Sequence, residues 1–66
     1  MAGNTRGKIK EHLEGCHRNL DWILNHLDIT LELIKEHNPK LTKSITANAK
    51  VAKLLDESLQ KVYSLI

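Results

Sequence analysis

Four residues in the first third of the chain have side chains that could hold a metal ion. His12 and Cys16 are four positions apart, and Glu14 and His17 are three positions apart. Either spacing places two ligand atoms on one side of a helix, and two chains together could complete a zinc site or a di-iron bundle. Because no Cys-x-x-Cys or His-x-x-x-His pair accompanies them, we predict no metal and interpret Cys16 as a small apolar residue beside exposed histidines.

The sequence shows no recognisable pattern of residues for covalent or acid–base catalysis. It contains no nucleophile with a neighbouring base, no glycine-rich phosphate loop and no pair of carboxylates aimed at a core. A bundle filled with aliphatic side chains also leaves little room for a substrate pocket. We therefore predict that the protein is not an enzyme and uses no cofactor.

Lysines gather around the middle of the chain and could grip phosphate groups. They are Lys35, Lys40, Lys43, Lys50 and Lys53. The cluster contains no arginine and no aromatic residue on which a base could stack, and the net charge of the chain is only +2. Nucleic-acid contact by these lysines is therefore the second hypothesis, beside the simpler interpretation that they are solvated lysines on a helix.

Long helical patterns position these side chains, and one break separates them. Apolar residues recur at alternating steps of four and three from Ile9 to Ile34, and again from Leu41 to Ile66. Pro39 disfavours helical geometry at Asn38, so the first helix ends there. We predict an all-α fold in one domain, residues 1–66: an antiparallel two-helix hairpin with helices over about residues 6–37 and 40–66 and a turn at about 38–40.

The two apolar stripes mirror each other across the turn, so we expect them to form the seam between the helices. Asn48 would then be a buried polar residue that specifies how the helices pair. The predicted seam contains Ile9, Leu13, Cys16, Leu20, Ile23, Leu27, Thr30 and Ile34 from the first helix, and Leu41, Ile45, Asn48, Ala52, Leu55, Leu59, Val62 and Ile66 from the second.

Apolar residues in the second half of the first helix extend well beyond this seam. They cover an arc of roughly 200°, whereas a single helical partner needs only a narrow stripe. Trp22 either anchors a dimer or binds another protein, and His26 is either an edge residue or a pH-sensitive interface residue. We predict a homodimer that forms a four-helix bundle, with a hetero-complex as the alternative. The predicted interface consists of Trp22, Leu24, His26, Ile29, Leu31, Leu33, Val51 and Leu54.

In architecture the chain resembles the small plasmid copy-control hairpins of the Rop type. The resemblance covers the whole chain and rests on the mirrored stripes and the short turn at Asn38 and Pro39. It implies an antiparallel four-helix dimer that binds RNA, on the ground of shared architecture alone.

Length and composition favour an assembly over a free monomer. A core in a chain below ~70–80 residues rarely supplies more than ~3–5 kcal/mol, and this chain has 66 residues. One cysteine excludes an internal disulfide and fits a reducing, cytoplasmic location, and no apolar run approaches the ~20 residues that span a membrane. We predict a small non-catalytic interaction or regulatory module that self-associates and binds a partner protein through an apolar helical face. The alternative is a Rop-like RNA- or DNA-binding bundle.

Overall fold

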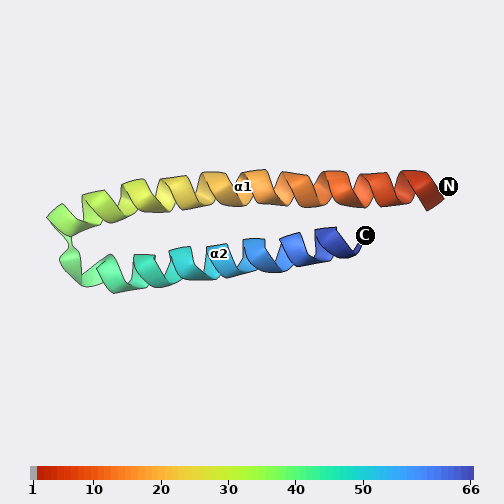
Figure 1. Cartoon of the computed structure of the whole chain (residues 1–66). Helices are drawn as coiled ribbons and strands as arrows, with labels where there is room; N and C mark the ends of the chain where they lie inside the picture. The colour runs from red at the N-terminus through yellow and green to blue at the C-terminus, as the bar shows by residue number, and fades with distance from the viewer. Residues whose placement is uncertain (1) are drawn as a thin grey trace.

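The computed structural model describes the backbone of residues 2–66 and the side chains of residues 5–66. It consists of helix α1 (Ala2–His37), a short 3-10 helix η1 (Pro39–Leu41) and helix α2 (Thr42–Leu65). Figure 1 shows α1 and α2 side by side and antiparallel, with η1 joining them at one end and both termini at the other. The predicted all-α hairpin is confirmed, although α1 begins at Ala2 and not near residue 6.

The turn forms where Pro39 interrupts helical hydrogen bonding. Asn38 adopts a non-helical backbone conformation, with φ −153° and ψ 74°, as expected of a residue before proline. Its N–H still donates to the Ile34 carbonyl at 2.7 Å, which completes the last turn of α1. Pro39 then begins η1, where its missing N–H is not needed. Asn38 and the short 3-10 helix η1 together therefore reverse the chain.

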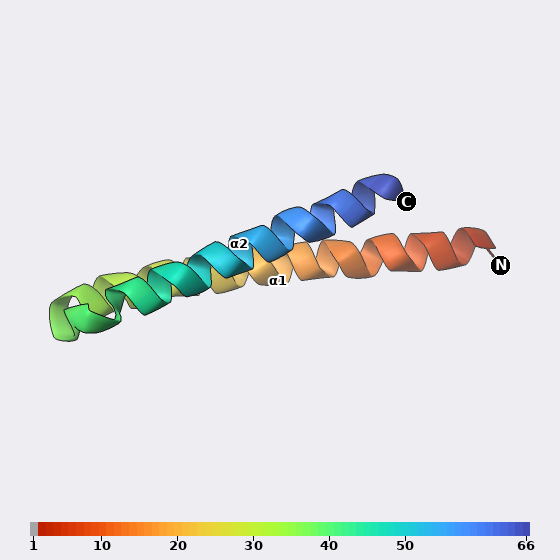
Figure 2. The same cartoon turned by 90° about the horizontal axis from the view of Figure 1, so that it is seen from below.

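The hairpin is a single layer of two helices with almost no core. Its dimensions are 53 × 15 × 11 Å and its radius of gyration is 15.7 Å, whereas a compact domain of this length would have about 11 Å. Viewed at right angles to Figure 1, the helices cross obliquely (Figure 2). Within residues 5–66 only Leu20 is buried, at 7% exposure. Neither α1 nor α2 has an apolar stretch, among the described residues, that could cross a bilayer.

The rows of residues that meet in the seam differ from the predicted ones. All positions of the observed seam are buried or half-buried, whereas Cys16, Ile23, Asn48 and Leu55 are exposed. The prediction that Asn48 is a core residue of the hairpin is therefore wrong. The observed seam contains Lys10, Leu13, His17, Leu20, Leu24, Leu27, Leu31 and Ile34 from α1, and Thr42, Ile45, Ala49, Ala52, Asp56, Leu59, Tyr63 and Ile66 from α2.

The physical reason for this difference is the width of the apolar arc. Several rows on such an arc have the same helical spacing, so periodicity does not determine which of them faces a single partner. The rows that do meet allow two polar contacts that the predicted seam would not: His17 with Asp56, and Tyr63 with Glu14. Each helix is thus rotated so that one apolar row moves out of the seam.

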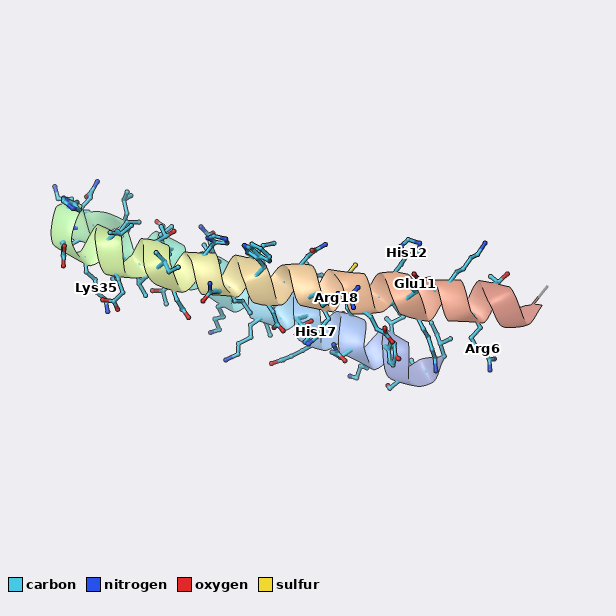
Figure 3. The ribbon with its side chains drawn as sticks, turned by 90° about the horizontal axis from the view of Figure 1, so that it is seen from above. Arg6, Glu11, His12, His17, Arg18 and Lys35 are labelled. Carbon is cyan, nitrogen blue, oxygen red and sulfur yellow. The ribbon has the colours of Figure 1, made fainter. Side chains whose placement is uncertain are left out.

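The two broad faces of the hairpin consequently differ in chemistry. Rows rotated out of the seam in the same sense on two antiparallel helices emerge on the same side. We call this side the apolar face; it contains Ile9, Cys16, Ile23, Leu41, Leu55 and Val62. On the opposite, polar face the two helices line shared hollows with Glu14, Arg18 and Asp28 of α1 and Lys50, Lys53 and Gln60 of α2. Seen from the α1 edge, His12 and Lys35 project to opposite sides (Figure 3).

Candidate functional site

The apolar face is a strip of mostly aliphatic side chains that are only partly covered, and exposed Asn48 interrupts it between Leu41 and Leu55. Ile9, Ile23, Leu41, Leu55 and Val62 keep 43–50% of their surface exposed. The helix beside each one covers part of the side chain and leaves the outward part in water. Cys16 is exposed in the same strip and lines a hollow with Ile9 and Leu13. The strip therefore resembles the inner surface of one layer of helices that has no second layer packed against it.

Trp22 and His26 form a pair on the exposed surface of α1. Their rings stack with centroids 5.8 Å apart, and Trp22 Nε1 donates a hydrogen bond to His26 Nε2. Thr30 Oγ1 donates to the His26 carbonyl at 2.8 Å. Trp22 nevertheless remains 68% exposed, so it is a large aromatic surface in contact with water.

Most of the interface residues predicted from the sequence are exposed in the hairpin. They are Trp22, His26, Ile29, Leu33, Val51 and Leu54. The structure places the other two, Leu24 and Leu31, in the intramolecular seam, where both are half-buried. Leu24 lies against Ala49 of α2 in a shared hollow. These two leucines therefore contribute to closing the hairpin itself.

The five predicted nucleic-acid contacts are all exposed but are interleaved with acidic groups. They are Lys35, Lys40, Lys43, Lys50 and Lys53. Lys35 Nζ lies 3.6 Å from Glu32 Oε1. Lys50 and Lys53 line the same hollow as Asp28. Neighbouring carboxylates reduce the attraction of these lysines for phosphate.

Polar contacts join α1 and α2 in the half of the hairpin that lies away from the turn, here called the open half. His17 Nδ1 lies 2.8 Å from Asp56 Oδ1, and His17 Nε2 lies 3.4 Å from Asp21 Oδ2. The Tyr63 hydroxyl donates to Glu14 Oε1 at 2.8 Å, and Lys10 Nζ lies 5.2 Å from the centre of the Tyr63 ring. In Figure 3, His17 lies on the α2 side of α1, whereas His12 points elsewhere. These contacts were not predicted, because the expected seam did not include Asp56 or Tyr63.

The hydrogen bond from His17 to Asp56 raises the pKa of His17 above its usual value of 6.5. Attraction by the Asp21 and Asp56 carboxylates adds to the increase, whereas partial burial and the positive charge of Arg18 lower the pKa. The surroundings thus favour the protonated, positively charged ring.

A possible metal site within residues 5–66 consists of His17, Asp21 and Asp56, whose ligand atoms all lie within 4.8 Å of one another. The two carboxylates, however, lie at opposite nitrogens of the imidazole ring. A metal ion takes one ring nitrogen and would leave one carboxylate out of reach without rearrangement. A protonated ring donates a hydrogen bond from Nδ1 to Asp56, and its positive charge attracts Asp21 at the same time. The geometry therefore fits a proton better than a metal ion.

Together these features define an elongated helical hairpin with one apolar and one polar broad face. Comparison of the chain with protein-family models, with curated proteins and with solved structures gives no match. Its function is therefore argued from its own surfaces.

Proposed function

We propose that this protein is a non-catalytic interaction module that self-associates through its apolar face into a four-helix bundle and binds another protein in that form. The main support is its exposed surface. The hairpin exposes 5425 Å², whereas a folded monomer of this size exposes about 4,200 Å². The excess of about 1,200 Å² is larger than the ~800 Å² that each partner contributes to a typical stable interface.

The absence of a closed core supports the same proposal. Burial of one leucine stabilises a fold by about 1.5–3 kcal/mol, and Leu20 is the one buried side chain among residues 5–66. Ordering the backbone costs about 1–2 kcal/mol per residue, so a two-helix layer needs more apolar contact than this. Stacking the apolar face of one chain on that of a second chain would place Ile23 and Leu55 in a core. In a dimer with a two-fold axis, both copies contribute the same face to the interface.

Light scattering during size-exclusion chromatography tests the self-association, and Leu55→Gln tests the face. Leu55 has 50% of its surface left to bury, so its two copies contribute about 1.5–3 kcal/mol to the dimer. We expect the wild type to have the mass of a dimer and Leu55→Gln to dissociate about 10- to 150-fold more readily.

Lys53→Gln is the matched control, because it introduces the same side chain on the polar face. It should leave the mass unchanged. A fully helical wild-type monomer at micromolar concentration, or equal weakening by both substitutions, would refute the proposal.

The partner protein in this proposal binds the side of α1 that carries Trp22. Trp22 and Ile29 lie on the back of α1, away from the seam, so a bundle leaves them exposed. Exposed tryptophans are frequent centres of binding energy in interfaces. We expect the wild type and the control variant Asn25→Ala to retain a protein from source-cell lysate, and Trp22→Ala not to retain it. Equal retention by all three would exclude this surface.

The reducing interior of the cell suits the single exposed thiol. Cys16 is free and exposed. Such a thiol persists where the glutathione pool keeps cysteines reduced. The proposal therefore locates the module in the cytoplasm.

Nucleic-acid binding by the lysines is the alternative function, favoured by the exposure of all five side chains. Binding of this kind weakens steeply with salt because bound phosphates release counterions. A titration with RNA and DNA at low and high salt tests it, using Lys43→Gln, Lys50→Gln and Lys53→Gln combined in one variant. Binding that falls with salt and is lost in the variant would favour this alternative. Its absence at low salt would remove it.

A further inference from the structure

We propose that His17 is a proton-dependent latch: its imidazolium ring, held between Asp21 of α1 and Asp56 of α2, closes the open half of the hairpin. The contacts lie within one chain. The proposal is therefore independent of self-association and of any partner protein.

The open half needs such a device because the turn closes only the other end of the hairpin. η1 joins the helices covalently at one end, whereas both termini of the chain lie at the other end (Figure 1). Near the turn the seam is largely aliphatic, with Leu27, Leu31 and Ile45 half-buried. In the open half the seam also contains the polar residues Lys10, His17, Asp56 and Tyr63, which lie among Leu13, Leu59 and Ile66. Closure of the open half therefore depends more on polar contacts than closure near the turn does.

The surroundings of His17 favour a protonated ring. Its Nδ1 faces the Asp56 carboxylate at 2.8 Å and its Nε2 faces the Asp21 carboxylate at 3.4 Å. A neutral imidazole has one donor and one acceptor nitrogen and no charge. It either loses the hydrogen bond to Asp56 or keeps it without the positive charge that strengthens it and attracts Asp21. The Asp56 side chain is only 17% exposed, so water replaces a lost hydrogen bond poorly there. Loss of the proton therefore weakens the link between the helices.

The charged groups around His17 come from both helices. Asp21 and Arg18 lie on α1 and Asp56 lies on α2, and Glu14 lines the same hollow as His17. Because the pKa of His17 is raised in the folded protein above 6.5, its contribution to stability is complete below that pH. The contribution is lost as the pH rises through the folded-state pKa.

Nuclear magnetic resonance titration of the four histidine rings tests the latch directly. We expect His17 in the wild type to titrate above 6.5 and its pKa to fall toward that value in Asp56→Asn. We also expect wild-type amides of residues 59–63 to exchange more slowly at about pH 5.5 than at about pH 8.5, after correction for intrinsic rates. His12→Gln is the matched control, since it removes a histidine of α1 outside the seam and should leave both results unchanged.

Two outcomes would overturn the proposal. One is a wild-type His17 that titrates at or below 6.5. The other is a folded Asp56→Asn protein in which the His17 titration and the pH dependence of amide exchange are unaltered. If Asp56→Asn does not fold, the wild-type titration still decides, and Asp21→Asn provides a second variant in which the pKa of His17 should fall. A failure of self-association would leave all of these measurements interpretable.

Discussion

Tyr63 makes two contacts across the seam with residues far away in the sequence. Its hydroxyl donates a hydrogen bond to Glu14, and its ring lies next to the ammonium group of Lys10. A cation over an exposed aromatic ring contributes about 0.5–1 kcal/mol. The half-buried ring thus supports the open half about two helical turns beyond Asp56 along α2.

Glu14→Gln should lower the pKa of Tyr63. The hydrogen bond to Glu14 raises this pKa above 10.0, and partial burial and the carboxylate charge act in the same direction. The contact therefore stabilises the hairpin below pH 10.0 and is lost as the pH rises through the folded-state pKa. Ultraviolet absorbance of the phenolate measures the titration. Glu11→Gln, at an exposed position of the same helix, should not change it; equal effects of the two substitutions would contradict the assigned cause.

At the scale of the elements, α1 contains glycines that its backbone does not need. Its 36 residues include Gly15, and neither Gly7 nor Gly15 has a positive φ. A Cβ added at Gly15 would meet only the end of the Arg18 side chain, at 3.9 Å, which is ordinary van der Waals contact. The helix therefore bears the conformational cost of this glycine without a steric reason.

Gly15→Ala should stabilise the protein by about 1 kcal/mol, because alanine restricts the unfolded chain and fits the helix. Thermal unfolding followed by circular dichroism measures the change. Gly7→Ala is the comparison: a Cβ there meets nothing within 4 Å, but the position lies near the end of α1 and should yield a smaller gain. Destabilisation by Gly15→Ala would show that another chain approaches α1 closely at this point.

At the scale of the whole molecule, the hairpin has the length of a bundle but half of its thickness. One face is aliphatic and the other mixes Asp28 and Glu14 with Lys50 and Lys53. A second layer on the aliphatic face would thicken the molecule without lengthening it. The proposed dimer is therefore distinguishable from an end-to-end assembly by its shape.

Small-angle X-ray scattering should show twice the mass of one chain with little increase in radius of gyration. The hairpin has 15.7 Å, and a second hairpin stacked ~10 Å away raises this to about 16.5 Å. The thermal midpoint should also rise with protein concentration, since dissociation accompanies unfolding. An end-to-end dimer would show a far larger radius, and a concentration-independent midpoint would argue for a monomer.

Two helices and the turn between them were determined by the sequence alone. Helical periodicity from Ile9 to Ile34 and from Leu41 to Ile66, with Pro39 between, depends on local geometry that a neighbouring element does not change. The spacing of His17 and Asp21 is likewise visible in one helix. Their contact with Asp56 cannot be predicted from the sequence of one helix, because it depends on how each helix is rotated about its own axis.

Only the tertiary structure decided that rotation. It turned Leu24 and Leu31 into the seam, left Ile23, Asn48 and Leu55 outside it, and brought His17 to Asp56. In the second half of α1 the apolar arc is wider than one seam, so adjacent rows there have equal periodicity and comparable hydrophobicity. Which row is buried is then determined by contacts between residues far apart in the chain, and these are absent from any local pattern.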